Sequence, residues 1–215
     1  MNKVTYDGPI KDFVDRYDGV SYKIWNSTDK EMTEIRKHIR DHYLKEQRFM
    51  CAYCRIEKKE SHGFTWDIEH VLPKSHYPAF LFAPENLAIA CKECNTPKDN
   101  REILASKLKA GDTLPTDKEA YAIVHPHFDK YSENFEISIV GSRRSYRILN
   151  KGKASFTYIA CNLMRFDYQY AEWDSFNAAV VKEVSDFLDN CPPDATPNEI
   201  KRMLGHMSFV AKCDF

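Results

Sequence analysis

Four cysteines form two pairs whose spacing suits metal binding. Cys51 and Cys54 form the pair CAYC, and Cys91 and Cys94 form the pair CKEC. Two CxxC pairs can supply the four thiolates of a tetrahedral zinc site. A thioredoxin-like redox role for one pair is the alternative, but no βαβ pattern surrounds either pair. The sequence therefore predicts a structural zinc with a long insert, residues 55–90, between its two halves.

The insert contains side chains that an inert zinc ribbon would not need. It holds Asp67, Glu69, His70 and Asn86, and Asn95 follows directly after the second cysteine pair. Hydrolysis of a phosphodiester needs a base that deprotonates water, and a divalent cation that neutralises charge on the phosphate and on the leaving 3′ oxygen. Histidine suits the base because its pKa lies near neutrality, while carboxylate and amide oxygens suit Mg²⁺ or Mn²⁺. This pattern indicates metal-dependent phosphodiester hydrolysis.

The arrangement of these side chains sets a requirement on the backbone. Glu69 and His70 are neighbours, and in an extended segment neighbouring side chains point to opposite faces. Both can serve one site only if the backbone turns between them or the substrate wraps around the strand edge. Pro73 favours an irregular end to this strand. Asn95 is expected at the start of a helix, from which its side chain can reach back to Glu69.

The motifs CAYC, WDIEHVLPKS, ENL and CKECNTPK, in this order, resemble an HNH endonuclease, a ββα-metal nuclease with a four-cysteine zinc frame. The resemblance implies DNA cleavage that leaves a 5′ phosphate and a 3′ hydroxyl. It implies that His70 is the general base, that Glu69 binds the catalytic metal and that Asn86 positions the base and its loop. Asn95 would complete the metal site, and asparagine there suits Mg²⁺ or Mn²⁺ better than Zn²⁺. Asp67 matches an often acidic position and is expected to help bind the metal.

Basic side chains near these motifs are the expected contacts to DNA phosphates. The formal net charge of the chain is −1, so a basic surface for nucleic acid must be local. Segment 141–153 carries five basic residues and no acid. The predicted nucleic-acid contacts are Lys74, Lys98, Arg143, Arg144 and Arg147.

Hydrophobic spacing outlines the elements that must position the site. Thr28 and Glu31 form a capping-box pattern at the start of a helix predicted over 28–46. Residues 134–140 alternate as a strand, and segment 141–153 continues it as a hairpin. Apolar residues recur at helical spacing over 154–189, which predicts one long helix or two in line. The core or a partner interface is the expected place for its stripe, which includes Trp173, Phe176, Val180 and Phe187.

The chain of 215 residues is 43% hydrophobic, which is enough to bury a core. We expect an α+β fold with an N-terminal helical extension (1–48), an HNH core (49–103) and a C-terminal hairpin and helical region (104–215). No run approaches the roughly 20 apolar residues of a membrane helix, and the N-terminus has no apolar signal-peptide core. These features predict a cytoplasmic protein without a membrane partner.

A second resemblance concerns the segments HPHFDKYSENF and ASFTYIACNLMRFD. They are similar to the C-terminal half of HNH proteins encoded beside ATPases in Septu and retron-associated anti-phage systems. This resemblance implies a defence effector with an ATPase partner, in a homo- or hetero-oligomer. The two histidines in HPH could suggest a second metal site, and a structural turn is the preferred interpretation. The rival function is a non-catalytic zinc-ribbon adaptor that binds nucleic acid or an ATPase.

Overall fold

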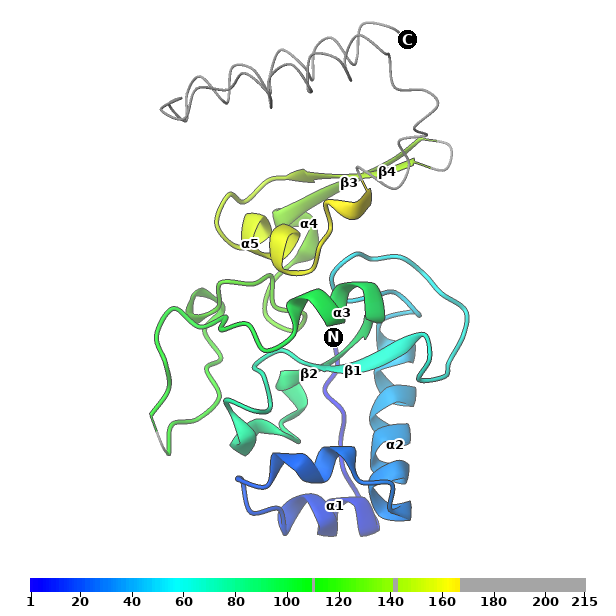
Figure 1. Ribbon diagram of the computed structural model, residues 1–215, viewed down its shortest axis with the longest axis vertical. Helices are drawn as coiled ribbons and strands as arrows, with labels where there is room; N and C mark the ends of the chain where they lie inside the picture. The colour runs from blue at the N-terminus through cyan, green and yellow to red at the C-terminus, as the bar shows by residue number, and fades with distance from the viewer. Residues whose placement is uncertain (110, 141–142, 167–215) are drawn as a thin grey trace, which may run out of the picture. The chain divides into compact units, whose positions relative to one another are not determined.

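The computed structural model describes residues 1–166 except 110, 141 and 142. The chain separates into one unit of Met1–Arg165 and a second unit of Phe166–Phe215. All the helices and strands described belong to the first unit, which combines both types as an α+β class predicts (Figure 1). None of the helices in these described residues is long and apolar enough to cross a membrane.

A short antiparallel strand pair lies between two helices. Strand β1 (Trp66–His70) pairs with β2 (Leu87–Cys91). Helix α3 (Lys92–Lys98) follows β2 directly and packs against both strands. Helix α2 (Lys30–Glu46) also packs against both strands, and Figure 1 shows α3 above the pair and α2 below it. Two strands and a helix are thus brought together around the segment that carries the motifs.

Helix α2 buries the apolar stripe predicted for it. Met32, Ile35, Ile39 and Tyr43 are each at most 1% exposed. The helix is preceded by α1 (Gly8–Asp15) and by the 3₁₀ turn η1 (Tyr22–Asn26), where the sequence had no clear period.

The predicted capping box at the start of α2 is wrong. Asp29 is the residue that precedes the first helical turn, and its side chain makes no capping hydrogen bond. Ser27 Oγ instead donates to the Asp29 carboxylate at 2.6 Å. The helix therefore begins one residue later than a Thr28 cap requires, at Lys30.

A second antiparallel pair confirms the strand and hairpin predicted after residue 134. Strands β3 (Phe135–Val140) and β4 (Arg143–Ile148) pair along their whole length, and α4 (Tyr131–Asn134) leads into β3. The hydroxyl of Tyr146 donates to the Cys54 carbonyl at 2.5 Å. The hydroxyl of Tyr131 donates to the Tyr53 carbonyl at 2.8 Å. Two tyrosines therefore attach this hairpin to the first cysteine pair.

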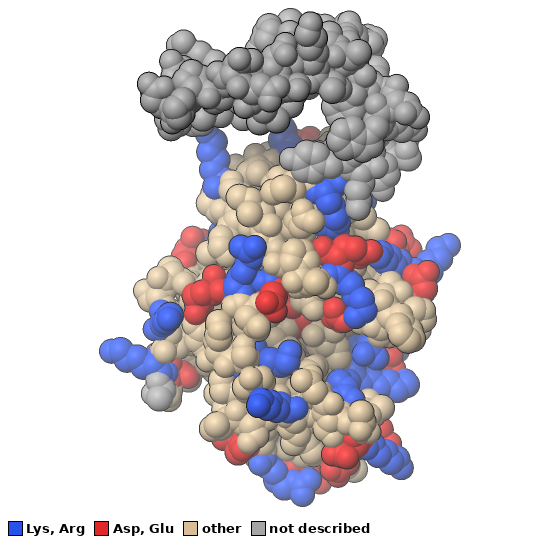
Figure 2. Space-filling model, viewed as in Figure 1, with Lys and Arg blue, Asp and Glu red and all other residues tan. Residues whose placement is uncertain are grey.

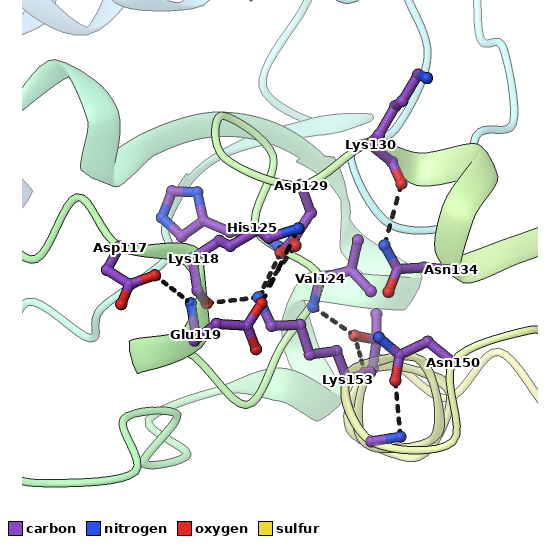
Figure 3. Close-up of polar contacts among 12 residues, drawn as sticks. Asp117, Lys118, Glu119, Val124, His125, Asp129, Lys130, Asn134, Asn150 and Lys153 are labelled. Carbon is purple, nitrogen blue, oxygen red and sulfur yellow. Dashed lines mark hydrogen bonds and ion pairs between the residues drawn. The ribbon is translucent and has the colours of Figure 1, made fainter.

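Helix α5 (Lys153–Ala160) is anchored by a buried ion pair (Figure 3). Lys153 Nζ donates to both carboxylate oxygens of Asp129 at 3.0 Å, and also to the Lys118 carbonyl. Asp129 in turn accepts from the backbone N–H of His125 at 2.8 Å. His125 is fully buried. These contacts agree with a structural turn at the HPH motif.

Helix α5 ends at Ala160, well before the end of the range 154–189, over which one long helix or two in line are predicted. Residues 161–164 form a turn in which Asn162 has a φ of 48°. Asparagine adopts this left-handed conformation more readily than most residues, and helices commonly end there. An uninterrupted helix is therefore wrong. The stripe of Trp173, Phe176, Val180 and Phe187 lies outside the described residues.

Candidate functional site

The four paired cysteines meet in a buried cluster. The sulfur atoms of Cys51, Cys54, Cys91 and Cys94 lie within 4.8 Å of one another. Cys54 Sγ and Cys91 Sγ are 3.7 Å apart. Tetrahedral zinc with Zn–S bonds of about 2.3 Å would place its sulfur ligands about 3.8 Å apart, so the cluster fits zinc. Among the described residues, these four are the group of three or more Cys, His, Asp or Glu side chains that lie close enough together to hold a metal ion.

A buried arginine lies against this cluster. Arg165 Nη2 donates to Cys94 Sγ at 3.3 Å, and its side chain is buried. The backbone N–H of Cys91 donates to Cys51 Sγ at 3.3 Å. A zinc ion with four thiolates carries a formal charge of −2, and both donors reduce the free energy of burying that charge.

Strand β1 presents two acidic side chains to α3. Asp67 Oδ2 accepts from Asn95 Nδ2 at 3.0 Å, and Asp67 Oδ1 accepts from Lys92 Nζ at 2.7 Å. One helical turn on, Lys98 Nζ lies 2.6 Å from Glu69 Oε1. Residues two apart on a strand share a face, and so do residues three apart on a helix, so the pairs 67–95 and 69–98 form on the same sides of β1 and α3. The expected contact from Asn95 to Glu69 is thus a contact to Asp67.

Glu69 is almost completely buried, with 4% of its surface exposed. Its Oε1 atom also accepts from the Tyr53 hydroxyl at 2.9 Å. Burial raises the pKa of the Glu69 carboxyl above its ordinary value, and the bonds from Lys98 and Tyr53 oppose that rise. Oε1 is therefore occupied by two donors, which leaves Oε2 as the oxygen available to a cation.

His70 ends strand β1 and is held on two sides. Its Nε2 lies 3.1 Å from the carbonyl oxygen of Leu81. A carbonyl only accepts, so Nε2 carries the hydrogen and Nδ1 keeps a lone pair. The Trp25 ring meets the His70 ring edge-on, with centroids 4.5 Å apart. Burial, reinforced by the positive charges of Lys74 and Lys98, lowers the pKa of His70 to about 3, so the ring is neutral near pH 7.

Asn86 fastens the loop that follows His70. Its Oδ1 accepts from the backbone N–H of Leu72 at 2.7 Å. Its Nδ2 donates to the carbonyls of Leu72, at 3.2 Å, and Phe80, at 3.1 Å. The side chain is fully buried. Asn86 therefore holds the loop that contains the Leu81 carbonyl, the partner of His70 Nε2.

Asn86→Ala is expected to destabilise the protein by roughly 3 kcal/mol, because it leaves buried backbone groups of the loop without partners. Thermal unfolding measures the change. Asn26→Ala is the matched control, since Asn26 is exposed and its loss should leave the melting temperature unchanged. Equal melting temperatures for the two variants would contradict the role given to Asn86.

An open hollow of about 450 Å³ brings together the predicted base and two predicted metal ligands. Glu69 and His70 line it from the end of β1, and Asn95 lines it from α3. Since β1 ends at His70, neighbouring side chains reach one space, as the sequence required. The acid-to-amide bond turns Asn95 Nδ2 toward Asp67, which leaves Asn95 Oδ1 for another partner. Carboxylate and amide oxygens beside open space fit Mg²⁺ or Mn²⁺, which bind few protein ligands and keep several waters.

Two predicted side chains lie elsewhere than expected. Asp67 is outside the lining of the hollow, and both of its oxygens are engaged by Lys92 and Asn95. Lys98 was predicted at a DNA phosphate, but it is 0% exposed and pairs with Glu69. A fully buried ammonium group cannot contact a phosphate at the surface. Lys74, by contrast, is partly exposed and lines the hollow.

The basic hairpin makes several internal contacts. Arg144 donates to the Arg55 carbonyl at 3.1 Å and to the Tyr146 hydroxyl at 2.8 Å. Arg147 is exposed and forms an ion pair with Glu136. The Arg143 side chain is outside what the structure describes. Figure 2 shows basic and acidic side chains interspersed over one face, without a large field of one sign.

Three residues of the two centres escaped the sequence analysis. Tyr53 lies inside the CAYC motif, whose CxxC spacing predicts a role only for its two cysteines. Trp25 and Arg165 are distant in sequence from the parts they contact. For these two residues the sequence contains no local signal, because the contact is made only by the tertiary fold.

Comparison with known proteins agrees with the motif segment. A family model described as HNH endonuclease matches residues 51–101. A stretch of 68 residues is 34% identical to "Protein ea31" of Escherichia phage lambda, and it covers 32% of this chain and 19% of that protein. No solved structure matches the chain. Residues 51–101 are thus similar to HNH endonucleases, and the remainder of the chain lies outside the match.

Proposed function

We propose that residues 49–103 form a ββα-metal HNH core and that the chain hydrolyses DNA phosphodiester bonds with Mg²⁺ or Mn²⁺. The observation that carries the proposal is the shared hollow, which Glu69, His70 and Asn95 all line. The match of residues 51–101 to HNH endonucleases supports the same reaction class. A zinc-ribbon adaptor has no need for a neutral histidine, a carboxylate and an amide around one open space.

His70 is the general base in this proposal. Its Nε2–H is committed to the Leu81 carbonyl, so Nδ1 is the atom that accepts a proton from water. The ring is neutral near pH 7, so Nδ1 carries no proton, and the Trp25 ring packs edge-on against it. The oxygen of that water forms the new bond to phosphorus as the bond to the 3′ oxygen breaks, and the leaving 3′ oxygen takes a proton from solvent water. The products are a 5′ phosphate and a 3′ hydroxyl.

Glu69 and Asn95 would hold the divalent ion, through the carboxylate oxygen Oε2 and the amide oxygen Oδ1. When bound, this ion neutralises charge on the phosphate and on the leaving 3′ oxygen. Asp67 orients Asn95 through its bond to Nδ2. Lys74, which lines the hollow, is a proposed phosphate contact. Further contacts to DNA are assigned to the hairpin residues Arg143, Arg144 and Arg147.

A structural zinc ion on the four paired cysteines completes the proposed metal content. The similarity of segments 125–135 and 154–167 to proteins of anti-phage systems supports a wider role. In that role the chain is a cytoplasmic defence effector that works with an ATPase partner, in a homo- or hetero-oligomer. The resemblance of those two segments is the support for this wider role.

The test is cleavage of supercoiled plasmid DNA and of a labelled RNA by the zinc-loaded chain. Cleavage of DNA should require added Mg²⁺ or Mn²⁺ and should stop when that ion is chelated while the structural zinc is retained. Product ends should be joined by DNA ligase without phosphate addition, because they carry 5′ phosphates. Tight binding of either nucleic acid with no cleavage under any of these metals would favour the adaptor instead.

A further inference from the structure

Tyr53 and Lys98 both bond to the same oxygen of Glu69. The Tyr53 hydroxyl donates to Glu69 Oε1 at 2.9 Å, and Lys98 Nζ lies 2.6 Å from that atom. All three side chains are buried, with Tyr53 and Lys98 at 0% exposure and Glu69 at 4%. Lys98 Nζ also donates to the His70 carbonyl at 3.3 Å. One buried ammonium group therefore contacts both the acid and the backbone of the neighbouring histidine.

The two donors come from the two halves of the cysteine cluster. Tyr53 lies between Cys51 and Cys54 in the first pair. Lys98 lies one helical turn beyond Cys94, and α3 carries both residues. The place of each donor is thus fixed by cysteines of the cluster. Each half contributes one of the donors that hold Glu69 Oε1.

We propose that Tyr53 and Lys98 are positioning residues. They hold the metal-ligating carboxylate of Glu69 at a fixed position relative to the zinc cluster. The proposal rests on the function proposed above, since it takes Glu69 as a ligand of the divalent ion. Two donors on Oε1 restrict the position of the carboxylate and leave Oε2 for the divalent ion. Partners in the shell behind a metal ligand typically change metal affinity or activity by about 10- to 100-fold when removed.

The arrangement makes the two metal centres dependent on each other. Loss of the cysteine cluster would release the Tyr53 loop and the start of α3 together, and with them both donors to Glu69. The cluster then does more than stabilise the fold, because it sets the geometry at the second metal. This dependence can be measured without any catalytic turnover.

The first test compares Tyr53→Phe with Tyr131→Phe in the full, zinc-loaded chain. Tyr131 is the matched control, because its hydroxyl also bonds to this loop, at the Tyr53 carbonyl, but does not contact Glu69. Titration calorimetry with Mn²⁺ measures the affinity, and Glu69→Gln identifies the site. Tyr53→Phe should weaken Mn²⁺ binding about 10-fold with unchanged zinc content, and Tyr131→Phe should bind as the parent chain does.

The second test uses Lys98→Met, which removes the buried ammonium group but keeps most of its volume. Loss of one partner from a buried ion pair is strongly destabilising, so this variant is paired with Lys98→Met/Glu69→Gln. The double variant should recover much of the lost melting temperature, since no buried charge is left unpaired. No recovery would show that Lys98 is not coupled to Glu69 and would overturn its part of the proposal.

The outcomes separate the two proposals. If Glu69→Gln abolishes Mn²⁺ binding while Tyr53→Phe and a folded Lys98→Met bind Mn²⁺ like the parent chain, the positioning role is wrong and the metal ligand stands. If Glu69→Gln binds Mn²⁺ like the parent chain, Glu69 is not a ligand, and both proposals are wrong. Weakened binding in Tyr53→Phe but not in Tyr131→Phe supports the positioning role.

Discussion

His70→Ala is expected to lower the rate of DNA cleavage by roughly 100-fold or more, the scale of general-base catalysis. The substitution removes Nδ1, the ring nitrogen that is not bonded to the Leu81 carbonyl, from a residue that lines the hollow. Substrate binding should change far less, because the phosphate contacts and the metal ligands remain. Single-turnover cleavage of plasmid DNA at saturating Mn²⁺ measures the effect on the chemical step.

Two further variants distinguish loss of the general base from loss of the fold. His70→Asn keeps a side-chain amide that can donate to the Leu81 carbonyl but supplies no base, so it should also lose cleavage. His76→Ala is the matched control, because His76 is exposed, lies six residues away and is absent from the lining of the hollow. It should cleave at the parental rate. Parental cleavage by both His70 variants would refute the mechanism.

Cys94→Ser is expected to abolish stoichiometric zinc binding and to lower the melting temperature of the whole first unit. Zinc binding in such small frames is largely folding free energy, of order 10 kcal/mol at neutral pH for zinc-finger peptides. Cys94 is also the sulfur to which Arg165 donates, so its loss leaves a buried guanidinium with a weakened partner. Metal analysis and thermal unfolding of the purified chain measure both effects.

The matched control for this change is Cys161→Ala. Cys161 is a fully buried cysteine that lies outside the cluster. Its replacement should retain full zinc and shift the melting temperature only slightly. A Cys94→Ser protein with full zinc and an unchanged melting temperature would show that Cys94 is not a ligand.

The parts of the site that the sequence predicted are those fixed by short-range rules. Two CxxC pairs point to one metal wherever they occur, because a tetrahedral ion needs four thiolates. The end of β1 at His70 agrees with the strand end expected before Pro73, and Asn95 follows the cysteine pair at the start of α3. Each of these rules concerns residues that are close together in the sequence, so the local arrangement can be predicted from the motif itself.

The misplaced residues depend on partners that no local pattern contains. Lys98 is the last residue of α3, a position where a lysine is usually exposed. A lysine is rarely buried unless it is paired. Its partner, Glu69, is on another element, and the pairing follows only from the way α3 crosses β1. The early end of α5 had a local sign in Asn162, but the apolar stripe continued through it and favoured a longer helix.

The Trp25 contact affects how residues 51–101 could be transferred between proteins. Trp25 lies outside residues 51–101, yet its ring packs edge-on against His70 and close to Phe82, with centroids 4.5 and 6.0 Å away. A recombinant chimera that moved only residues 51–101 into another chain would contain His70 but lack the Trp25 ring that packs against it. Among related chains, substitutions at position 25 should therefore covary with substitutions at position 82. The segment that must be transferred to keep the surroundings of His70 is therefore longer than residues 51–101, and it begins no later than η1.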